Sequence, residues 1–166
     1  MRRLTTRKRF VGLIAGLALA AGIATASAQT QTGSSHHAAA VVELSYTKWF
    51  APGFPNMVGV VGGDIVGQFG GAVLERTVAP DGLSAHLTAV YIVISPDPAQ
   101  TFTAHIEGTS DLQTGNAVLD GRVVDGWLKR AHVHVEFKTI NCTQAPNGKC
   151  FQGTISVTRS SEGSGH

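Results

Sequence analysis

The sequence predicts an all-β protein that folds as a single antiparallel β-barrel, and three observations support this prediction. First, stretches rich in Val, Ile, Thr and Phe alternate with turn sequences such as "APDG" and "APNG". Second, no window repeats its apolar residues at the spacing of an amphipathic helix. Third, glycines recur inside the stretches, where they let strands bend sharply. The predicted strands lie within residues 41–50, 57–78, 83–95, 101–108, 116–124, 131–140 and 150–159.

The glycines decide between the two architectures that this many short strands can form. A closed barrel and a two-sheet sandwich both accommodate seven or eight strands. Bent and coiled strands are what a small barrel needs to turn its corners, so the glycines of 57–78 favour the barrel, which we place at residues 41–159. The same glycines lack the strand-to-helix context of a phosphate-binding loop. They are Gly59, Gly62, Gly63, Gly67, Gly70 and Gly71.

Both ends of the chain lie outside this predicted domain. Residues 1–28 have the parts of a cleaved signal peptide: a basic start, an apolar run at 11–23 and Ala-Ser-Ala at 26–28. An apolar run of 13 residues is shorter than the roughly 20 that cross a bilayer, so cleavage is preferred to a retained anchor. We read 29–40 as a flexible linker and 160–166 as a disordered tail. The protein is therefore predicted to be exported, periplasmic or secreted, with no membrane span after cleavage.

Charge and cysteine content narrow the function further. Five of the 13 basic residues and none of the 11 acidic ones lie in the predicted leader, so the mature chain carries a formal charge of −3. A nucleic-acid partner is therefore not expected. Cys142 and Cys150 are the only cysteines, and in an exported chain they predict a disulfide. Their spacing differs from a C-x-x-C redox motif, and two cysteines are too few for a structural zinc site.

The stretch 131–140, "AHVHVEFKTI", contains two histidines that allow two interpretations. Side chains alternate along a strand, so the apolar set faces the core while His132, His134 and Glu136 face water. The alternative is a metal site, because Gly126 and the two histidines match the opening of the first cupin motif, with His86 or His105 as a completing ligand. On a straight strand, however, the Cα atoms of His132 and Glu136 lie roughly 13 Å apart, which is unfavourable for a shared metal. We prefer the outer-face interpretation.

The stretch 83–95 is apolar on both faces around Tyr91. We expect it to be buried in the core on both sides, with a neighbouring subunit or a lined cavity as the alternatives. A buried tyrosine hydroxyl needs a hydrogen-bond partner, so Tyr91 is a candidate polar group inside a cavity.

The segment 102–137 also resembles a known family. Its "HIEG", its Val118–Gly121 run and its Gly126-Trp127-Leu128 are similar to the barrel-closing half of allene oxide cyclases and their dirigent-like relatives. The upstream "GDIVGQFGGAVLER" resembles the glycine-rich early strands of the same family. The resemblance implies an eight-stranded calycin-type barrel, often a homotrimer, that holds a hydrophobic small molecule and guides its cyclisation or isomerisation. No catalytic residue is carried over from that family, although Glu43 is the one early acidic candidate.

Three functional hypotheses follow. The preferred one is an exported barrel that binds a hydrophobic small molecule in its lumen. In its catalytic form, this hypothesis makes the protein a cofactor-free cyclase or isomerase. The expected ligand contacts are Tyr91, Phe69, Glu43 and Trp127. The second is a non-catalytic barrel that acts in assembly or in cell-envelope contacts. The third is a cupin-like metalloenzyme built on the histidine strand. A serine hydrolase is not expected, because the chain has no G-x-S-x-G elbow.

Overall fold

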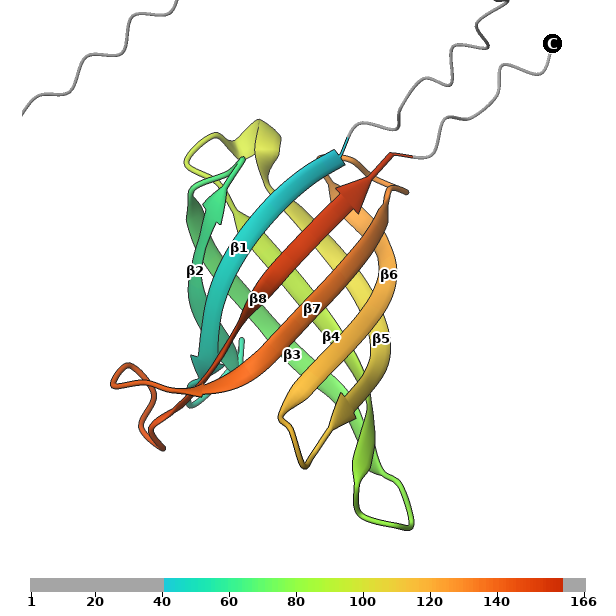
Figure 1. Cartoon of the computed structure of the whole chain (residues 1–166). Coiled ribbons are helices and arrows are strands. Elements are labelled where there is room, and N and C mark those ends of the chain that lie inside the picture. The colour runs from blue at the N-terminus through green and yellow to red at the C-terminus, as the bar shows by residue number, and fades with distance from the viewer. Residues whose placement is uncertain (1–40, 160–166) are drawn as a thin grey trace, which may run out of the picture. The chain divides into compact units, whose positions relative to one another are not determined.

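A computed structural model describes residues 41–159, and within them the chain forms a closed antiparallel β-barrel (Figure 1). Each strand pairs with the next in sequence, and β8 returns to pair with β1, so the sheet has no free edge. The predicted all-β, eight-stranded barrel is therefore confirmed. The predicted signal peptide, the linker at 29–40 and the tail at 160–166 lie outside the described residues.

The eight strands differ little in length, and one short helical turn interrupts them. In the described part of the chain no helix is long and apolar enough to cross a membrane. The elements are β1 Val41–Phe50, β2 Met57–Gly63, β3 Gly67–Val78, β4 Ser84–Ile94, the 3₁₀ turn η1 Pro98–Gln100, β5 Phe102–Asp111, β6 Asn116–Gly126, β7 His132–Asn141 and β8 Lys149–Thr158.

The stretch 57–78, which reads as one region of β-structure in the sequence, is split into β2 and β3. Gly63 has φ +95°, a backbone conformation that side chains other than glycine rarely adopt, and it begins the turn between the two strands. The backbone N–H of Asp64 donates to the Glu43 carbonyl, and the Asp64 carboxylate accepts from the Glu43 N–H. These two bonds fasten the turn to β1.

Alternation along the strands places the core inside the barrel. Val133 and Val135 of β7 are fully buried, while His132, the first residue of the strand, is exposed. Strand β4 differs from the prediction that both of its faces are buried: Tyr91 and Val93 point inward and are buried, but Ile94 is 43% exposed. The barrel wall is one sheet thick, so the outer face of β4 has no second layer to cover it.

Glycines inside the strands mark places where neighbouring strands approach closely. A Cβ atom at Gly153 of β8 would lie 1.8 Å from the Glu136 carbonyl oxygen of β7. A Cβ at Gly121 of β6 would lie 2.0 Å from the His105 carbonyl oxygen of β5. Such distances are far below van der Waals contact, so only glycine permits these strands to bend against each other. The glycines of this sequence thus allow the curvature that closes a small barrel.

The predicted disulfide between Cys142 and Cys150 is present, with a Cα–Cα distance of 5.7 Å. It closes the loop between β7 and β8, and the Cys142 N–H donates to the Gly148 carbonyl at 3.0 Å across the same loop. The bridge therefore ties the last hairpin together at the end of the barrel where β1 terminates.

Candidate functional site: a pocket at one end of the barrel

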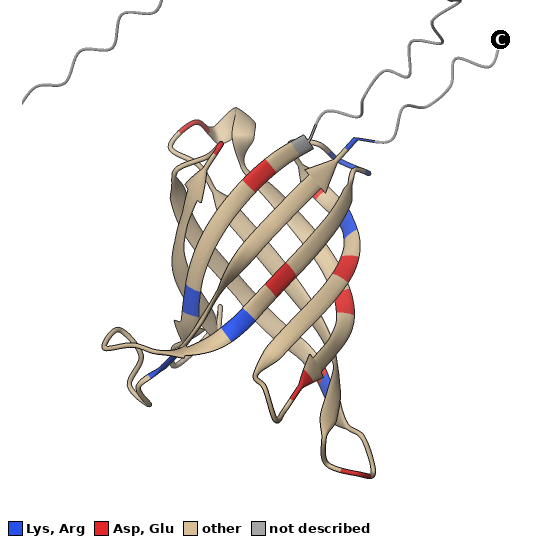
Figure 2. Ribbon diagram, viewed as in Figure 1, with Lys and Arg blue, Asp and Glu red and all other residues tan. Residues whose placement is uncertain are grey.

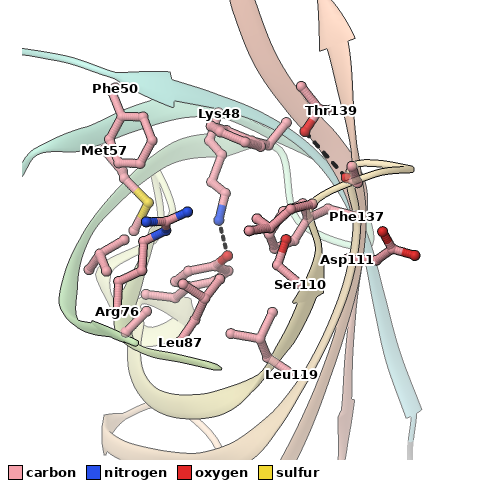
Figure 3. Close-up of a pocket in the computed structure, with 16 residues that line it drawn as sticks. Lys48, Phe50, Met57, Arg76, Leu87, Ser110, Asp111, Leu119, Phe137 and Thr139 are labelled. Atoms are coloured by element: carbon pink, nitrogen blue, oxygen red, sulfur yellow. Dashed lines mark hydrogen bonds between the residues drawn. The ribbon is translucent and has the colours of Figure 1, made fainter. Parts of the chain in front are cut away.

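A pocket of about 300 Å³ opens at the end of the barrel where β1 terminates and β2 begins. This is the lower end of the usual size range of ligand pockets. Its walls are mostly apolar and come from all eight strands, and Figure 3 shows their side chains around the pocket. The main apolar contributors are Phe50, Met57, Val73, Leu87, Ala89, Tyr91, Leu119, Phe137 and Phe151, and the basic ones are Lys48 and Arg76.

Lys48 is the most unusual of these residues. The alternation of β1 directs Leu44, Tyr46 and Lys48 to the same inner face, and all three are buried. Only 3% of Lys48 is exposed, whereas lysines are almost never fully buried in proteins unless they are paired. Figure 2 shows that the other charged residues are scattered over several strands and loops of the barrel.

The amine of Lys48 is held by aromatic residues. Its Nζ donates a hydrogen bond to the hydroxyl of Tyr91, as Figure 3 shows. The Nζ lies 4.1 Å from the ring centroid of Tyr91 and 4.4 Å from that of Phe137. The rings of Tyr46, Phe69 and Phe151 are farther away, at 5.6–5.7 Å. The amine therefore sits among rings from five different strands.

No carboxylate pairs with this amine among residues 41–159. Asp111 lines the pocket, but it is exposed and its carboxylate accepts the backbone N–H groups of Gln113 and Thr114. These hydrogen bonds lower the pKa of Asp111 and hold it at the rim. The buried lysine is thus left without a counter-ion.

Two opposing effects set the charge of Lys48. Burial lowers the pKa of its ammonium group well below the usual value. The two close rings favour the cation, each by about 0.5–2 kcal/mol, whereas removing an ion from water costs several kcal/mol even after relaxation of the protein. Desolvation is the larger effect, so burial shifts the equilibrium of Lys48 toward the neutral amine.

Tyr46 adds a second polar group to this interior. Its hydroxyl is buried and has no hydrogen-bond partner within the described chain. Burial raises the pKa of Tyr46 well above its usual value, so the phenol stays neutral. Its ring stacks on Phe69 at a centroid distance of 5.5 Å, and Phe69 packs edge-on against Tyr91 at 4.8 Å. These three rings form the layer of the core next to the pocket.

The structure brings two of the four predicted ligand contacts to the lumen. Tyr91 lines the pocket and contacts Lys48, and Phe69 lies in the layer beside it. Glu43 instead lies on the outer face, where its carboxylate accepts a hydrogen bond from the Ser156 hydroxyl at 2.8 Å. Glu43 alternates with the inward residues of β1 and therefore faces away from the lumen.

Trp127, the fourth predicted contact, is far from the pocket. It lies between β6 and β7, at the opposite end of the barrel, and is partly buried against the core. Sequence reasoning missed the two basic residues of the pocket, Lys48 and Arg76. For Lys48 a signal was available, since the alternating positions 42, 44, 46, 48 and 50 read Val-Leu-Tyr-Lys-Phe.

The histidine strand lies on the outside of the barrel. The Asp120 carboxylate of β6 lies 2.8 Å from Nδ1 of His134 and 3.5 Å from Nε2 of His132. The hydrogen bond to Asp120 raises the pKa of His134, and a weaker one to Glu136 adds to this effect. Within 41–159 no group of three or more His, Cys, Asp or Glu side chains is arranged to hold a metal ion.

The fold and this pocket define a closed antiparallel barrel with an apolar pocket at one end and a buried lysine on its wall. No family model matches the chain, and no curated protein or solved structure matches it either. The resemblance to allene oxide cyclases therefore stays a prediction about the family.

Proposed function

We propose that this protein binds a small, mostly apolar molecule in the end pocket, with Lys48 and Arg76 available to its polar part. The observation that carries the proposal is the buried, unpaired Lys48 on the wall of an otherwise apolar pocket. A buried polar group that forms no ion pair is unfavourable for folding, and such groups occur preferentially at functional sites.

The shape of the pocket supports the same proposal. Aromatic and aliphatic side chains give the contact area that apolar ligands need, and a few polar groups fix their orientation. Arg76 is exposed at the mouth, whereas Lys48 is deeper, so the two polar contacts are separated along the path of a ligand. An amphipathic molecule whose polar part meets either residue fits this arrangement.

The proposal also includes export and catalysis, and each of these two parts is supported by observations other than the pocket. The signal peptide predicted at residues 1–28 favours export, and the disulfide is compatible with it. The cyclase or isomerase activity rests on the family resemblance and on general chemistry, because a closed apolar site holds a reactive molecule in a folded shape and keeps water out. No cofactor is needed for that chemistry.

The binding proposal is tested at the mouth of the pocket. Ser110 of β5 lines the pocket and is partly exposed, whereas its neighbour Thr109 faces the outside. We expect Ser110→Trp to weaken binding of the fluorescent probe N-phenyl-1-naphthylamine at least about tenfold, or about 1.4 kcal/mol. Thr109→Trp, the matched control, keeps the wild-type affinity. Equal affinity of both variants, or no binding by the wild type, would contradict the proposal.

A second function, in assembly, is favoured by apolar side chains on the outer surface. Val60, Ile94 and Val66 are 54%, 43% and 71% exposed, and Gln68 of β3 pairs with both Val60 and Ile94, so these residues lie across neighbouring strands. Exposed apolar patches often mark contacts with other proteins. Sedimentation analysis of the full chain tests this idea, since Ile94→Lys should dissociate an oligomer that uses the patch.

A further inference from the structure

Lys48 differs from the other lysines of the barrel in its surroundings, and therefore in the reactions that its amine can undergo. Lys129 and Lys149 are exposed and bind Asp125 at 3.8 Å and Asn141 at 2.7 Å, and Lys138 is exposed on β7. Exposed ammonium groups remain protonated near neutral pH and have no free electron pair. Among the lysines of residues 41–159, only Lys48 lies inside the barrel.

Building on the proposed ligand pocket, on which this inference rests, we propose that the Nζ of Lys48 forms an imine with an apolar aldehyde or ketone bound there. The amine lies on the pocket wall beside apolar side chains, and no carboxylate holds it in an ion pair. A carbonyl carbon at the end of an apolar chain is the electrophile that such an amine meets.

The electrostatics of the site support the nucleophilic state. Lys48 is buried among five aromatic rings, and this burial lowers the pKa of its ammonium group, which favours the neutral, nucleophilic amine. Desolvation in an apolar pocket is a known way of activating a lysine for Schiff-base formation. The surrounding rings also exclude water, so hydrolysis of a formed imine is slowed.

The step balances without any oxidant or reductant. The lone pair of the neutral amine attacks the carbonyl carbon, the carbonyl π bond breaks, and a proton moves from nitrogen to oxygen to give a carbinolamine. The carbon–oxygen bond then breaks, one water molecule leaves, and a carbon–nitrogen double bond forms. The hydroxyl of Tyr91, which already contacts Nζ, is positioned to donate the proton that the leaving oxygen needs, and it recovers a proton from the nitrogen as the neutral imine forms.

Tyr91 is a positioning and proton-donating residue in this scheme. Its ring also packs against Phe69 and Tyr46, which fixes the direction of its hydroxyl. Tyr91→Phe removes the proton donor but keeps the ring. We expect this variant to form the adduct more slowly than the wild type.

The test is reductive trapping of the wild-type protein with decanal. Sodium cyanoborohydride reduces an imine to a stable secondary amine, so the adduct is visible by intact mass and located by peptide mapping. We expect one decyl group on Lys48 near pH 7, ahead of Lys129, Lys138 and Lys149. Those three lie on the outside of the barrel, away from the pocket that concentrates the aldehyde beside Lys48.

Two variants and one competitor complete the design. Lys48→Met keeps an apolar side chain of similar length and removes the amine, so it should abolish the adduct. Lys138→Met removes an exposed lysine and should leave the adduct unchanged. Decan-1-ol, which cannot form an imine, should protect Lys48 by occupying the pocket.

The outcomes separate this inference from the proposed function. If the wild type binds N-phenyl-1-naphthylamine but decanal labels Lys48 no faster than the exposed lysines, imine formation is refuted and the binding function stands. If the probe does not bind and decanol gives no protection, the pocket proposal itself fails. Peptide mapping of the wild type gives this answer even where a variant does not fold.

Discussion

The substitution Lys48→Met tests the central electrostatic argument through stability. Methionine removes the Nζ amine but retains an unbranched side chain in the ring of aromatic residues. The variant should be more stable than the wild type near neutral pH, because it no longer has to bury an amine that water would solvate or protonate.

The size of the effect follows from two contributions. Burying a polar group without full compensation costs about 1–3 kcal/mol. The variant loses the hydrogen bond from Nζ to the Tyr91 hydroxyl, which is worth about 1 kcal/mol. We therefore expect a net gain of up to about 2 kcal/mol in the free energy of unfolding near pH 7.

The pH dependence is the more specific part of this prediction. The pKa of Lys48 is lowered in the folded state, so the unfolded chain binds more protons than the folded one between the folded pKa and about 10.4. Wild-type stability therefore rises with pH in that window, by at most about 1.4 kcal/mol per pH unit from this group. The advantage of Lys48→Met should shrink as the pH rises and stop changing above the unfolded pKa.

Urea unfolding of both proteins at several values between about pH 7 and pH 10 measures this difference directly. Comparing the two proteins at each pH cancels the other titrating groups. A difference in stability that stays constant over the whole range would refute the reasoning, since it would show that Lys48 has the same protonation in the folded and unfolded states. A variant that is less stable at every pH would show that the aromatic rings hold a stable cation.

Three further predictions concern the barrel itself. Gly153→Ala should destabilise the protein by about 3 kcal/mol in thermal or urea unfolding, because its Cβ would overlap the neighbouring backbone. Replacing Cys142 and Cys150 with serine should cost about 2–3 kcal/mol under oxidising conditions and nothing relative to the reduced wild type. Asp120→Asn should lower the pKa of His134 in an NMR titration. In the wild type, the raised pKa of His134 stabilises the fold below about pH 6.5, and this stabilisation is lost as the pH rises through the pKa of the folded state. Because the pair is exposed, it contributes at most about 1 kcal/mol.

Matched controls for two of these predictions are available on other strands of the barrel. A Cβ at Gly70 would meet only ordinary contacts, at 3.6 Å from Pro55, so Gly70→Ala should change stability far less than Gly153→Ala. Equal effects of the two glycine substitutions would contradict the close-approach argument. For the histidine, Glu107→Gln on β5 changes a carboxylate that makes no ion pair with His134 and should leave its pKa unchanged.

The barrel could be predicted because its signals are local. The two-residue alternation along β7 and the glycines of β2 and β3 lie within short stretches of sequence, and each has a direct structural meaning. The disulfide could be predicted equally well, because the chain has only two cysteines. The split of residues 57–78 into two strands depends on one turn at Gly63, which sequence periodicity does not show.

The pocket was harder to predict because it is assembled from distant parts of the chain. A lysine near the end of a strand normally extends its amine to water. At Lys48 this is prevented by Phe137 and Phe151, which come from β7 and β8 about ninety to a hundred residues later. The prediction that Glu43 contacts a ligand was wrong for a local reason. Side chains alternate along β1, and because Leu44 and Tyr46 face the lumen, Glu43 faces the outside of the barrel.

The pairing of β1 with β8 determines where the pocket entrance lies relative to the two ends of the described segment. Val41 is opposite Thr158 in this pair, so the described segment begins and ends at the same rim. The pocket opens at the other rim, beyond Phe50. A tether, tag or surface attached directly at Val41 or Thr158 would therefore leave the entrance facing away from the point of attachment, free to receive molecules from solution.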